Sequence, residues 1–291
     1  MELRQVKADH PELGEAVDLQ IDLLMLQRRV HARLSLPWME VDPEWLRREH
    51  AGGRPFLRFD EIPLDWTEVR LMFRQTADIL LRHQALEVRD HEALQHLART
   101  GNLLEPLVAR WYKARADAGR GGEGAEPGGI TATPTSPTAE TAAAEAAPVN
   151  ADALDQVLTL AMRPFLERCA ESIQQRIDLS TWHEPYCPLC GGEAEFAVIT
   201  PSAERRLICG RCTACWLFDS ITCPFCRNAD RHRITSFTSR DGQYRLYACD
   251  VCCRYLKAYD GRAARRPLLL AADVIATLPL DAAAMQKGYR A

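Results

Sequence analysis

Apolar residues recur at intervals of three and four along most of the first 180 residues, a spacing that places them on one face of a helix. The first such stretch predicts a helix that opens near Pro11, with Asp9 as its N-cap. Its apolar positions are Leu13, Val17, Ile21, Leu24 and Leu34. Asp42 followed by Pro43 predicts the start of a short second helix, because aspartate caps a helix and proline suits its first turn.

A capping signal precedes the next helix. Asp65 and Glu68 have the spacing of a capping box. The apolar positions that follow on one face are Val69, Phe73, Ala77 and Leu80. Asp90 can start a further helix that ends near Gly101, and residues 103–113 predict another. Because the connections are short, we expect these helices to pack as a bundle of antiparallel neighbours.

Residues 116–150 differ in composition from the helices around them. They are rich in Gly, Pro, Ala and Thr and contain no aromatic residue, so they cannot bury enough apolar surface to offset the entropy of ordering. We expect a flexible segment, either a linker or an insertion in one helical domain. The insertion is favoured, because a helix that needs a partner surface follows at once; Pro164 should bend it. Its apolar stripe is Leu154, Leu158, Ala161, Phe165, Cys169, Ile173 and Ile177.

The pattern changes to strand-like segments after residue 190. Residues 193–200 and 205–209 predict two strands with a turn between them. Residues 233–249 predict a second hairpin around Asp241-Gly242, a strong signal for a tight turn. The sequence therefore predicts helices first and short β-hairpins afterwards.

Composition narrows the class of protein. The chain has 291 residues, 47% hydrophobic and 26% charged, and a net charge of −4, which is typical of a soluble globular protein with no general attraction to nucleic acid or anionic membrane. The first fifteen residues contain no apolar leader segment. The late apolar run at 267–280 is too short to span a bilayer and carries Asp273, so we expect no membrane insertion and a cytoplasmic protein.

The cysteines are the main chemical signal. Ten of the eleven lie between Cys187 and Cys253, and eight of them form four Cys-x-x-Cys pairs. The pairs group as two sets with hairpin-length separations of 18 and 22 residues, the pattern of zinc ribbons and rubredoxin. The predicted metal ligands are Cys187, Cys190, Cys209 and Cys212 in one site and Cys223, Cys226, Cys249 and Cys252 in the other.

Two such sets predict two mononuclear metal ions. Four thiolates in a tetrahedron suit zinc or iron, and the spacing does not choose between them. With four protein ligands neither ion keeps an open position, which argues against hydrolytic catalysis. Thiol redox catalysis is disfavoured, because that motif normally opens a helix and these pairs lie on hairpins. We also expect metal loss to unfold the cysteine-rich half and to spare the helices.

Three cysteines and two histidines stay outside the predicted ligand sets. Cys169 lies on a helical stripe and is expected to be a buried thiol, whereas Cys215 and Cys253 are alternative ligands or labile thiols. His183 and His232 are the histidines that could lie near the sites.

The motifs "CPLC", "RLICGRCTACW", "CPFC" and "YACDVCCRYLKAYD" resemble those of the formate dehydrogenase accessory protein FdhE family. In the resembling pattern a tryptophan stands four residues after the second-turn cysteine, as Trp216 does after Cys212, and Tyr-Leu-Lys follows the final pair, as Tyr255-Leu256-Lys257 does after Cys252. This register favours Cys212 over Cys215 and Cys252 over Cys253 as ligands. The tail "ADVIATLPLDAAAMQKGY" is also similar, although it begins with Ala272 where the family often has aspartate.

The resemblance implies a cytoplasmic, non-enzymatic assembly factor. Such a protein would act in the maturation of formate dehydrogenase by binding its molybdenum-bearing catalytic subunit. It also implies rubredoxin-like iron, with zinc as the alternative. Trp216, Phe218 and Tyr255 are candidates for the docking surface, although each is individually expected to fill the core of a small ribbon.

A nucleic-acid-binding ribbon protein is the alternative function. Residues 187–260 carry ten Arg or Lys and eight Asp or Glu, and eight metal-bound thiolates would make the segment net negative. A nucleic-acid reader needs a basic face, so this function is disfavoured. The arginines that could still form such a face are Arg205, Arg206, Arg211, Arg231 and Arg233.

We expect an α+β fold with an N-terminal helical bundle followed by two tandem zinc-ribbon or rubredoxin-like units. The predicted divisions are a helical domain at 1–180, a first four-cysteine unit at 181–219, a second at 220–262, and a C-terminal helical tail at 263–291.

Overall fold

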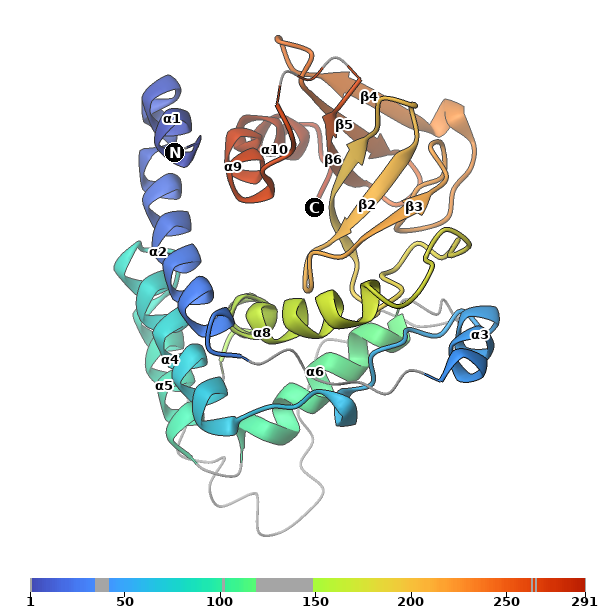
Figure 1. The fold of residues 1–291 in the computed structure, drawn as a ribbon. Helices are drawn as coiled ribbons and strands as arrows, with labels where there is room; N and C mark the ends of the chain where they lie inside the picture. Colours follow the sequence, from blue (N-terminus) through green and yellow to red (C-terminus); the bar gives the residue numbers. More distant parts are fainter. Residues whose placement is uncertain are drawn as a thin grey trace.

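A computed structural model describes residues 2–34, 42–100, 103–118, 149–262, 264 and 266–290. The segment predicted to be flexible lies mostly outside the described residues, as does Gly101. The described chain has helices in its N-terminal half and a six-stranded sheet followed by two short helices in its C-terminal half (Figure 1). This is the α+β arrangement that the sequence predicts.

The helices of the N-terminal half are α1 (Glu2–Asp9), α2 (Gly14–His31), α3 (Pro43–Ala51), α4 (Trp66–Arg82), α5 (Val88–Arg99), α6 (Leu104–Ala118) and α8 (Ala151–Gln174). Asp42 and Asp65 cap α3 and α4 as predicted, each accepting a hydrogen bond from the backbone two residues on. The face of α4 predicted to be apolar is buried. Asn150 caps α8 by accepting from the backbone of Asp152 and Ala153. No described helix has the length and apolar composition needed to cross a membrane.

Two predicted helix starts are wrong. Asp9 ends α1 and does not cap the next helix, because a 3-10 turn at Pro11–Leu13 intervenes and α2 begins at Gly14. That turn resets the helical phase. The buried residues of α2 are therefore Val17, Leu23, Leu26, Gln27 and Val30. Asp90 lies inside α5 and is buried, and its carboxylate accepts from the Asn150 backbone N–H at 3.0 Å instead of capping its own helix.

The sheet consists of two three-stranded units. The first contains β1 (Ala194–Ile199), β2 (Arg205–Cys209) and β3 (Cys215–Phe218), and the second contains β4 (Ile234–Thr238), β5 (Tyr244–Cys249) and β6 (Arg254–Asp260). Neighbours within each unit are antiparallel, and both predicted hairpins, β1–β2 and β4–β5, are confirmed. The third strand of each unit was not predicted.

A parallel pairing of β1 with β6 joins the units into one sheet with the order β3-β2-β1-β6-β5-β4. Phe196 lies opposite Lys257 in this pairing. The two units therefore follow each other head to tail, and the Cys-x-x-Cys turns of both units lie at the same end of the sheet.

The C-terminal helices, α9 (Leu270–Ala276) and α10 (Leu278–Gln286), cover one face of the sheet. Their apolar residues pack against a cluster formed by Phe196, Ile208, Tyr244 and Tyr259. In Figure 1 they lie between the sheet and helices α1 and α2, and α9 contacts both of these helices. The tail therefore connects the sheet to the N-terminal half.

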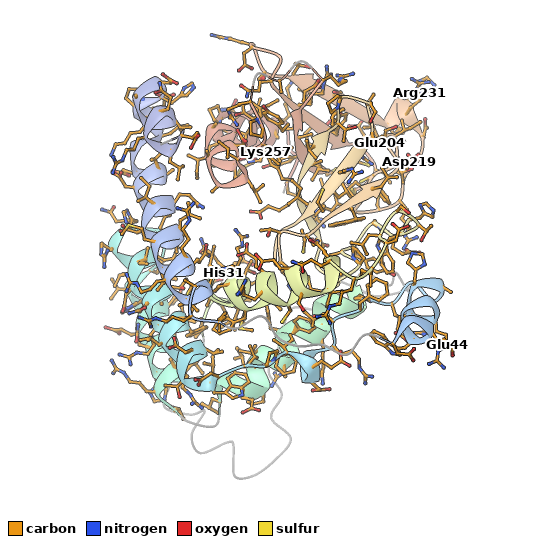
Figure 2. All side chains as sticks on the ribbon, in the orientation of Figure 1. His31, Glu44, Glu204, Asp219, Arg231 and Lys257 are labelled. Carbon is orange, nitrogen blue, oxygen red and sulfur yellow. The ribbon has the colours of Figure 1, made fainter. Side chains whose placement is uncertain are left out.

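Buried ion pairs fix this tail in position. Asp273 is fully buried and accepts hydrogen bonds from the Tyr244 hydroxyl at 2.6 Å and from the Arg266 guanidinium. Lys257, labelled beside these helices in Figure 2, is 7% exposed and pairs with Asp281 at 2.5 Å. Charges this far from water hold a structure only when they are paired, so these contacts specify how the tail docks.

The main core crosses the predicted division at residue 180. It runs from α2 through α4 and α8 into the first unit of the sheet, and includes Leu207, Trp216 and the four cysteines of the first predicted site. The helical half and the first unit therefore share one hydrophobic interior.

Candidate metal centres

All four Cys-x-x-Cys turns have the same backbone conformation. In each, the residue after the second cysteine donates its backbone N–H to the carbonyl of the first cysteine, at distances of 2.9–3.1 Å. That residue has a positive φ of 54–71° in every case. The four residues in this position are Gly191, Thr213, Arg227 and Cys253. This conformation folds the chain back so that both sulfurs of a turn face the same point.

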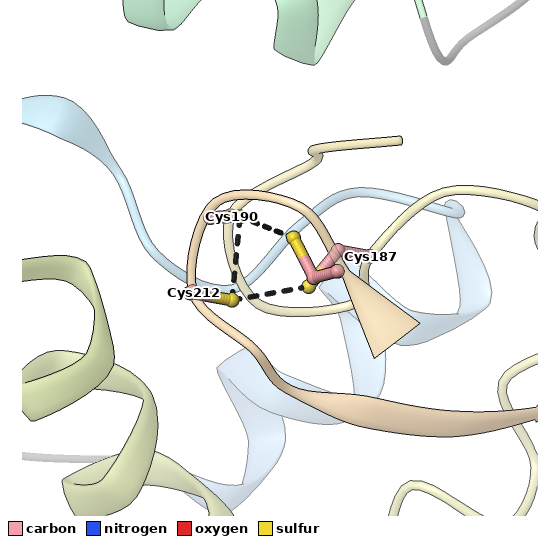
Figure 3. Close-up of side chains that lie close together, drawn as sticks. Cys187, Cys190 and Cys212 are labelled. Carbon is pink, nitrogen blue, oxygen red and sulfur yellow. Dashed lines mark hydrogen bonds between the residues drawn. The ribbon is translucent and has the colours of Figure 1, made fainter. Parts of the chain in front are cut away.

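The first cluster comes from the turn before β1 and the turn between β2 and β3. Its sulfurs lie 3.5 Å apart for Cys187–Cys212, 3.4 Å for Cys190–Cys209 and 3.5 Å for Cys190–Cys212 (Figure 3). A tetrahedron with zinc–sulfur bonds of about 2.3 Å has an edge of about 3.8 Å. The sulfurs are therefore arranged at nearly the separation that one metal ion requires.

The second cluster repeats this arrangement at the turn before β4 and the turn between β5 and β6. Cys223 and Cys252 have their sulfurs 3.7 Å apart, and those of Cys226 and Cys249 are 3.6 Å apart. All four sulfurs lie within 4.8 Å of one another, as in the first cluster. Cys226 and Cys252 are half-buried, whereas the four cysteines of the first cluster are buried.

Neither cluster can carry four ionised thiols without a cation. Burial raises the pKa of Cys187 and Cys212 well above that of a free thiol, and burial raises the pKa of Cys223 to about 11. Burial also acts on Cys209, but hydrogen bonds from the other three thiols outweigh it and lower the pKa of Cys209. A cysteine binds a metal ion as the thiolate, so a divalent ion would supply the positive charge that stabilises the ionised sulfurs of each cluster.

The donor sets therefore fit zinc or iron, and two clusters could hold two metal ions. Backbone N–H groups support the sulfurs: Leu189 donates to Cys187 and Arg211 to Cys209, each at 3.4 Å. Such hydrogen bonds stabilise a thiolate in either metal complex, so the geometry does not choose between the two elements.

The first cluster is built into the helical core. The backbone N–H groups of Phe56 and Leu57 donate to the carbonyls of Pro188 and Leu189 at 2.8 and 2.7 Å. On the other turn, the Arg211 guanidinium lies 3.9 Å from the centre of the Trp111 ring and donates to the carbonyls of Trp111 and Tyr112 in the middle of α6. The expectation that metal loss would spare the helices therefore conflicts with this arrangement at the first cluster.

The second cluster has fewer neighbours. Arg254 lies 3.7 Å from the centre of the Phe225 ring, and Arg205 of the first unit donates to the carbonyls of Asp219 and Thr222 in the loop before the cluster. Val251, at the tip of the last turn, is 52% exposed. The outer side of this cluster therefore faces solvent.

Comparison with known proteins finds similarity among solved structures. No protein-family model and no curated protein matches the chain. Among solved structures, it is similar to the crystal structure of the FdhE protein from Pseudomonas aeruginosa, with a TM-score of 0.58 and 22% identity. The similarity covers 99% of this chain and 90% of that one. The chain has the FdhE fold.

Within this FdhE fold, the remaining cysteines are separate from both clusters. Cys169 is buried on α8, where burial raises the pKa of its thiol to about 12. Cys215 begins β3 and lies opposite Ile208, and Cys253 is the exposed left-handed residue of the last turn. The shared turn geometry could have identified Cys253 from sequence, because it occupies the position of Gly191.

The FdhE fold also places the other residues that the sequence singled out. His183 and His232 are exposed, and neither imidazole hydrogen-bonds to a described cysteine. Trp216, Phe218 and Tyr255 are 1%, 7% and 5% exposed, so they fill the interior and do not form a docking surface.

Two of the five arginines considered for a basic face, Arg205 and Arg211, are buried. Both guanidinium groups bind backbone carbonyls of the protein itself. These two arginines therefore cannot contribute to a basic surface for nucleic acid.

Proposed function

We propose that the protein is a non-enzymatic accessory factor for the maturation of formate dehydrogenase and that it binds the catalytic subunit of that enzyme. The observation that carries this proposal is the FdhE fold, which extends over 99% of the chain and includes both four-cysteine clusters. The motifs that resemble the FdhE family lie on the four turns that bring these cysteines together.

We further propose that the eight clustered cysteines bind two mononuclear metal ions. Iron is favoured by the family resemblance and zinc is the alternative. When bound, the ions neutralise the thiolates and cross-link the turns. The ligands must stay reduced, which agrees with a cytoplasmic location.

The chain's own residues would make this scaffold useful for binding. Each turn is held by backbone hydrogen bonds, and the units share one sheet, so side chains between the turns have fixed positions. A rigid surface loses little conformational entropy when a partner docks, and more of the contact energy then appears as affinity. No described feature favours nucleic acid as the partner.

Co-purification with a tagged catalytic subunit tests the partner. We expect the wild-type protein and a deletion of residues 120–146 to bind, and a Cys223→Ser variant to bind less. Absence of binding by the metal-loaded wild type would refute the proposed partner. Tight, salt-sensitive binding to DNA or RNA would instead support the nucleic-acid alternative.

Elemental analysis of protein purified without chelator tests the metal sites. We expect two metal ions per chain, and visible absorption if they are ferric iron. One ion per chain, or disulfides between the clustered cysteines, would contradict the assignment of ligands.

A further inference from the structure

The two units of the sheet have matching turns before their first strands. Residues 187–190 read Cys-Pro-Leu-Cys and residues 223–226 read Cys-Pro-Phe-Cys. Both turns have the same two backbone hydrogen bonds. The first cysteine donates its N–H to the carbonyl five residues on, Cys187 to Gly192 and Cys223 to Asn228, at 2.8 Å each. Its own carbonyl accepts from the N–H four residues on, that of Gly191 or Arg227, at 3.0 Å in both turns. The two inner carbonyls of each turn therefore point in equivalent directions.

In the first unit these carbonyls are occupied. The extended segment around Phe56 and Leu57 donates consecutive backbone N–H groups to Pro188 and Leu189. The side chain of Leu189 is fully buried beneath it. The Tyr112 hydroxyl donates to the Leu57 carbonyl at 2.8 Å and so joins this segment to the surface of α6. One segment of chain thus covers the first turn through both backbone and side-chain contacts.

In the second unit the equivalent carbonyls belong to Pro224 and Phe225, and no segment of the described chain covers them. Pro224 and Phe225 are half-buried, and no hydrogen bond between described residues reaches their carbonyls. The turn between β5 and β6 is also less covered than its equivalent in the first unit, the turn between β2 and β3. Arg211 is 4% exposed in the first unit, and Val251, its equivalent, is 52% exposed. The exposed Val251 side chain and the carbonyls of Pro224 and Phe225 therefore lie on the two turns at this end of the sheet without the covering that the first unit has.

We propose that the tips of the second unit, Pro224-Phe225 and Val251, form a docking site for an extended apolar segment of another protein. The internal duplication carries this inference, because the same turn already holds such a segment in the first unit. The partner segment supplies two consecutive backbone N–H groups to Pro224 and Phe225, as in strand addition. Where Arg211 lies on an indole, Val251 offers only aliphatic surface, so the partner contacts it with an apolar side chain.

This site deepens the proposed function, since it names the surface that would receive the catalytic subunit. It rests on that function only for the identity of the partner. Its chemistry is independent of the partner and can be tested with a segment from this chain. Residues 52–60, Gly-Gly-Arg-Pro-Phe-Leu-Arg-Phe-Asp, contain the sequence that covers the first turn.

The test is a titration of zinc-loaded, ¹⁵N-labelled full chain with a synthetic peptide of residues 52–60; zinc is used because it is diamagnetic and leaves the amides of the turns observable. We expect saturable shifts of the backbone amides at 225–228 and 250–253. Val251→Ser and Phe225→Ser should each weaken binding at least tenfold, while Phe225→Leu, which recreates the first turn, should retain it. Val88→Ser is the matched control, because Val88 is 60% exposed on α5. Metal content and the remaining amide shifts of each variant show that it is folded.

Absence of saturable shifts up to millimolar peptide, or equal binding by Val251→Ser and the wild type, would overturn the site. Shifts confined to 187–192 would also overturn it, because the peptide would then replace its own segment at the first turn. A second arm measures binding of the formate dehydrogenase catalytic subunit. If the wild type binds it and Val251→Ser binds equally well, the docking site is wrong and the proposed function stands. If only the peptide binds, the proposed function is wrong and the site stands.

Discussion

Replacing Cys187 with serine should abolish binding of the first metal ion and also destabilise the helical half of the protein. Cys187 is fully buried in the core shared by both halves. A structural four-thiolate site contributes about 10–16 kcal/mol to folding in small domains, as much as the net stability of many whole proteins. Serine is a poor ligand for zinc or iron, so most of this contribution should be lost.

The contacts that depend directly on the first turn give a local estimate. Two backbone hydrogen bonds, from Phe56 and Leu57, stabilise by about 1 kcal/mol each. Burial of the Leu189 side chain adds about 2 kcal/mol. When the turn loses its metal, about 4 kcal/mol is therefore lost at this contact, which corresponds to about a thousandfold increase in opening.

Amide hydrogen exchange measures this opening at the two donors. We expect exchange at Phe56 and Leu57 to rise by about a thousandfold in Cys187→Ser, with a lower melting temperature by helical circular dichroism. Cys223→Ser is the matched variant. It should lose the second ion but leave these two amides protected, because its sulfur lies in the other cluster.

Cys169→Ala provides the control for a buried cysteine outside the clusters, and it should keep both metal ions. The reasoning is refuted if Cys187→Ser loses its metal while Phe56 and Leu57 stay protected. The first turn would then be held by packing alone, and the metal would not be needed to connect the two halves.

Three further variants test other parts of the structure. Cys253→Gly should keep both metals and change the free energy of unfolding by no more than about 1 kcal/mol, toward greater stability, because glycine adopts the left-handed conformation without strain; loss of the second metal would show that Cys253 is a ligand. Arg211→Lys should destabilise the protein by about 2 kcal/mol in denaturant titration, because lysine cannot both stack on Trp111 and reach two carbonyls; stability equal to wild type would contradict that role. Lys257→Met should cost about 3 kcal/mol by leaving Asp281 without its cation, and adding Asp281→Leu should recover part of that loss; a double variant that is less stable than the single would refute this.

The features that the sequence predicted correctly are local ones. The β4–β5 hairpin follows from the turn at Asp241-Gly242 and the alternation on either side, and α4 follows from its cap and apolar face. The grouping of cysteines also follows from short-range rules, since a two-residue gap fixes the direction of both sulfurs in one turn. None of these inferences needs distant parts of the chain to be placed.

The features that were missed depend on distant contacts. Strand β3 has four residues and no turn signal of the usual kind, and it becomes a strand by pairing with β2. The pairing of β1 with β6 joins residues about 60 positions apart, which periodicity cannot indicate. The start of α2 was misplaced because Pro11 suits a 3-10 turn as well as an α-helix.

The head-to-tail order of the units explains why equivalent turns have different surroundings. In a two-fold arrangement each unit would present the same edge to the other, and both sets of turns would have equal neighbours. Here β1 of the first unit pairs with β6 of the second, so the two outer edges are formed by non-equivalent strands, the third strand of the first unit (β3) and the first strand of the second (β4). The helical core extends over the first unit and encloses its cysteines, whereas Val251 of the second unit stays exposed. Duplication with this order therefore yields one unit that can anchor the fold and one whose turns remain available to a partner.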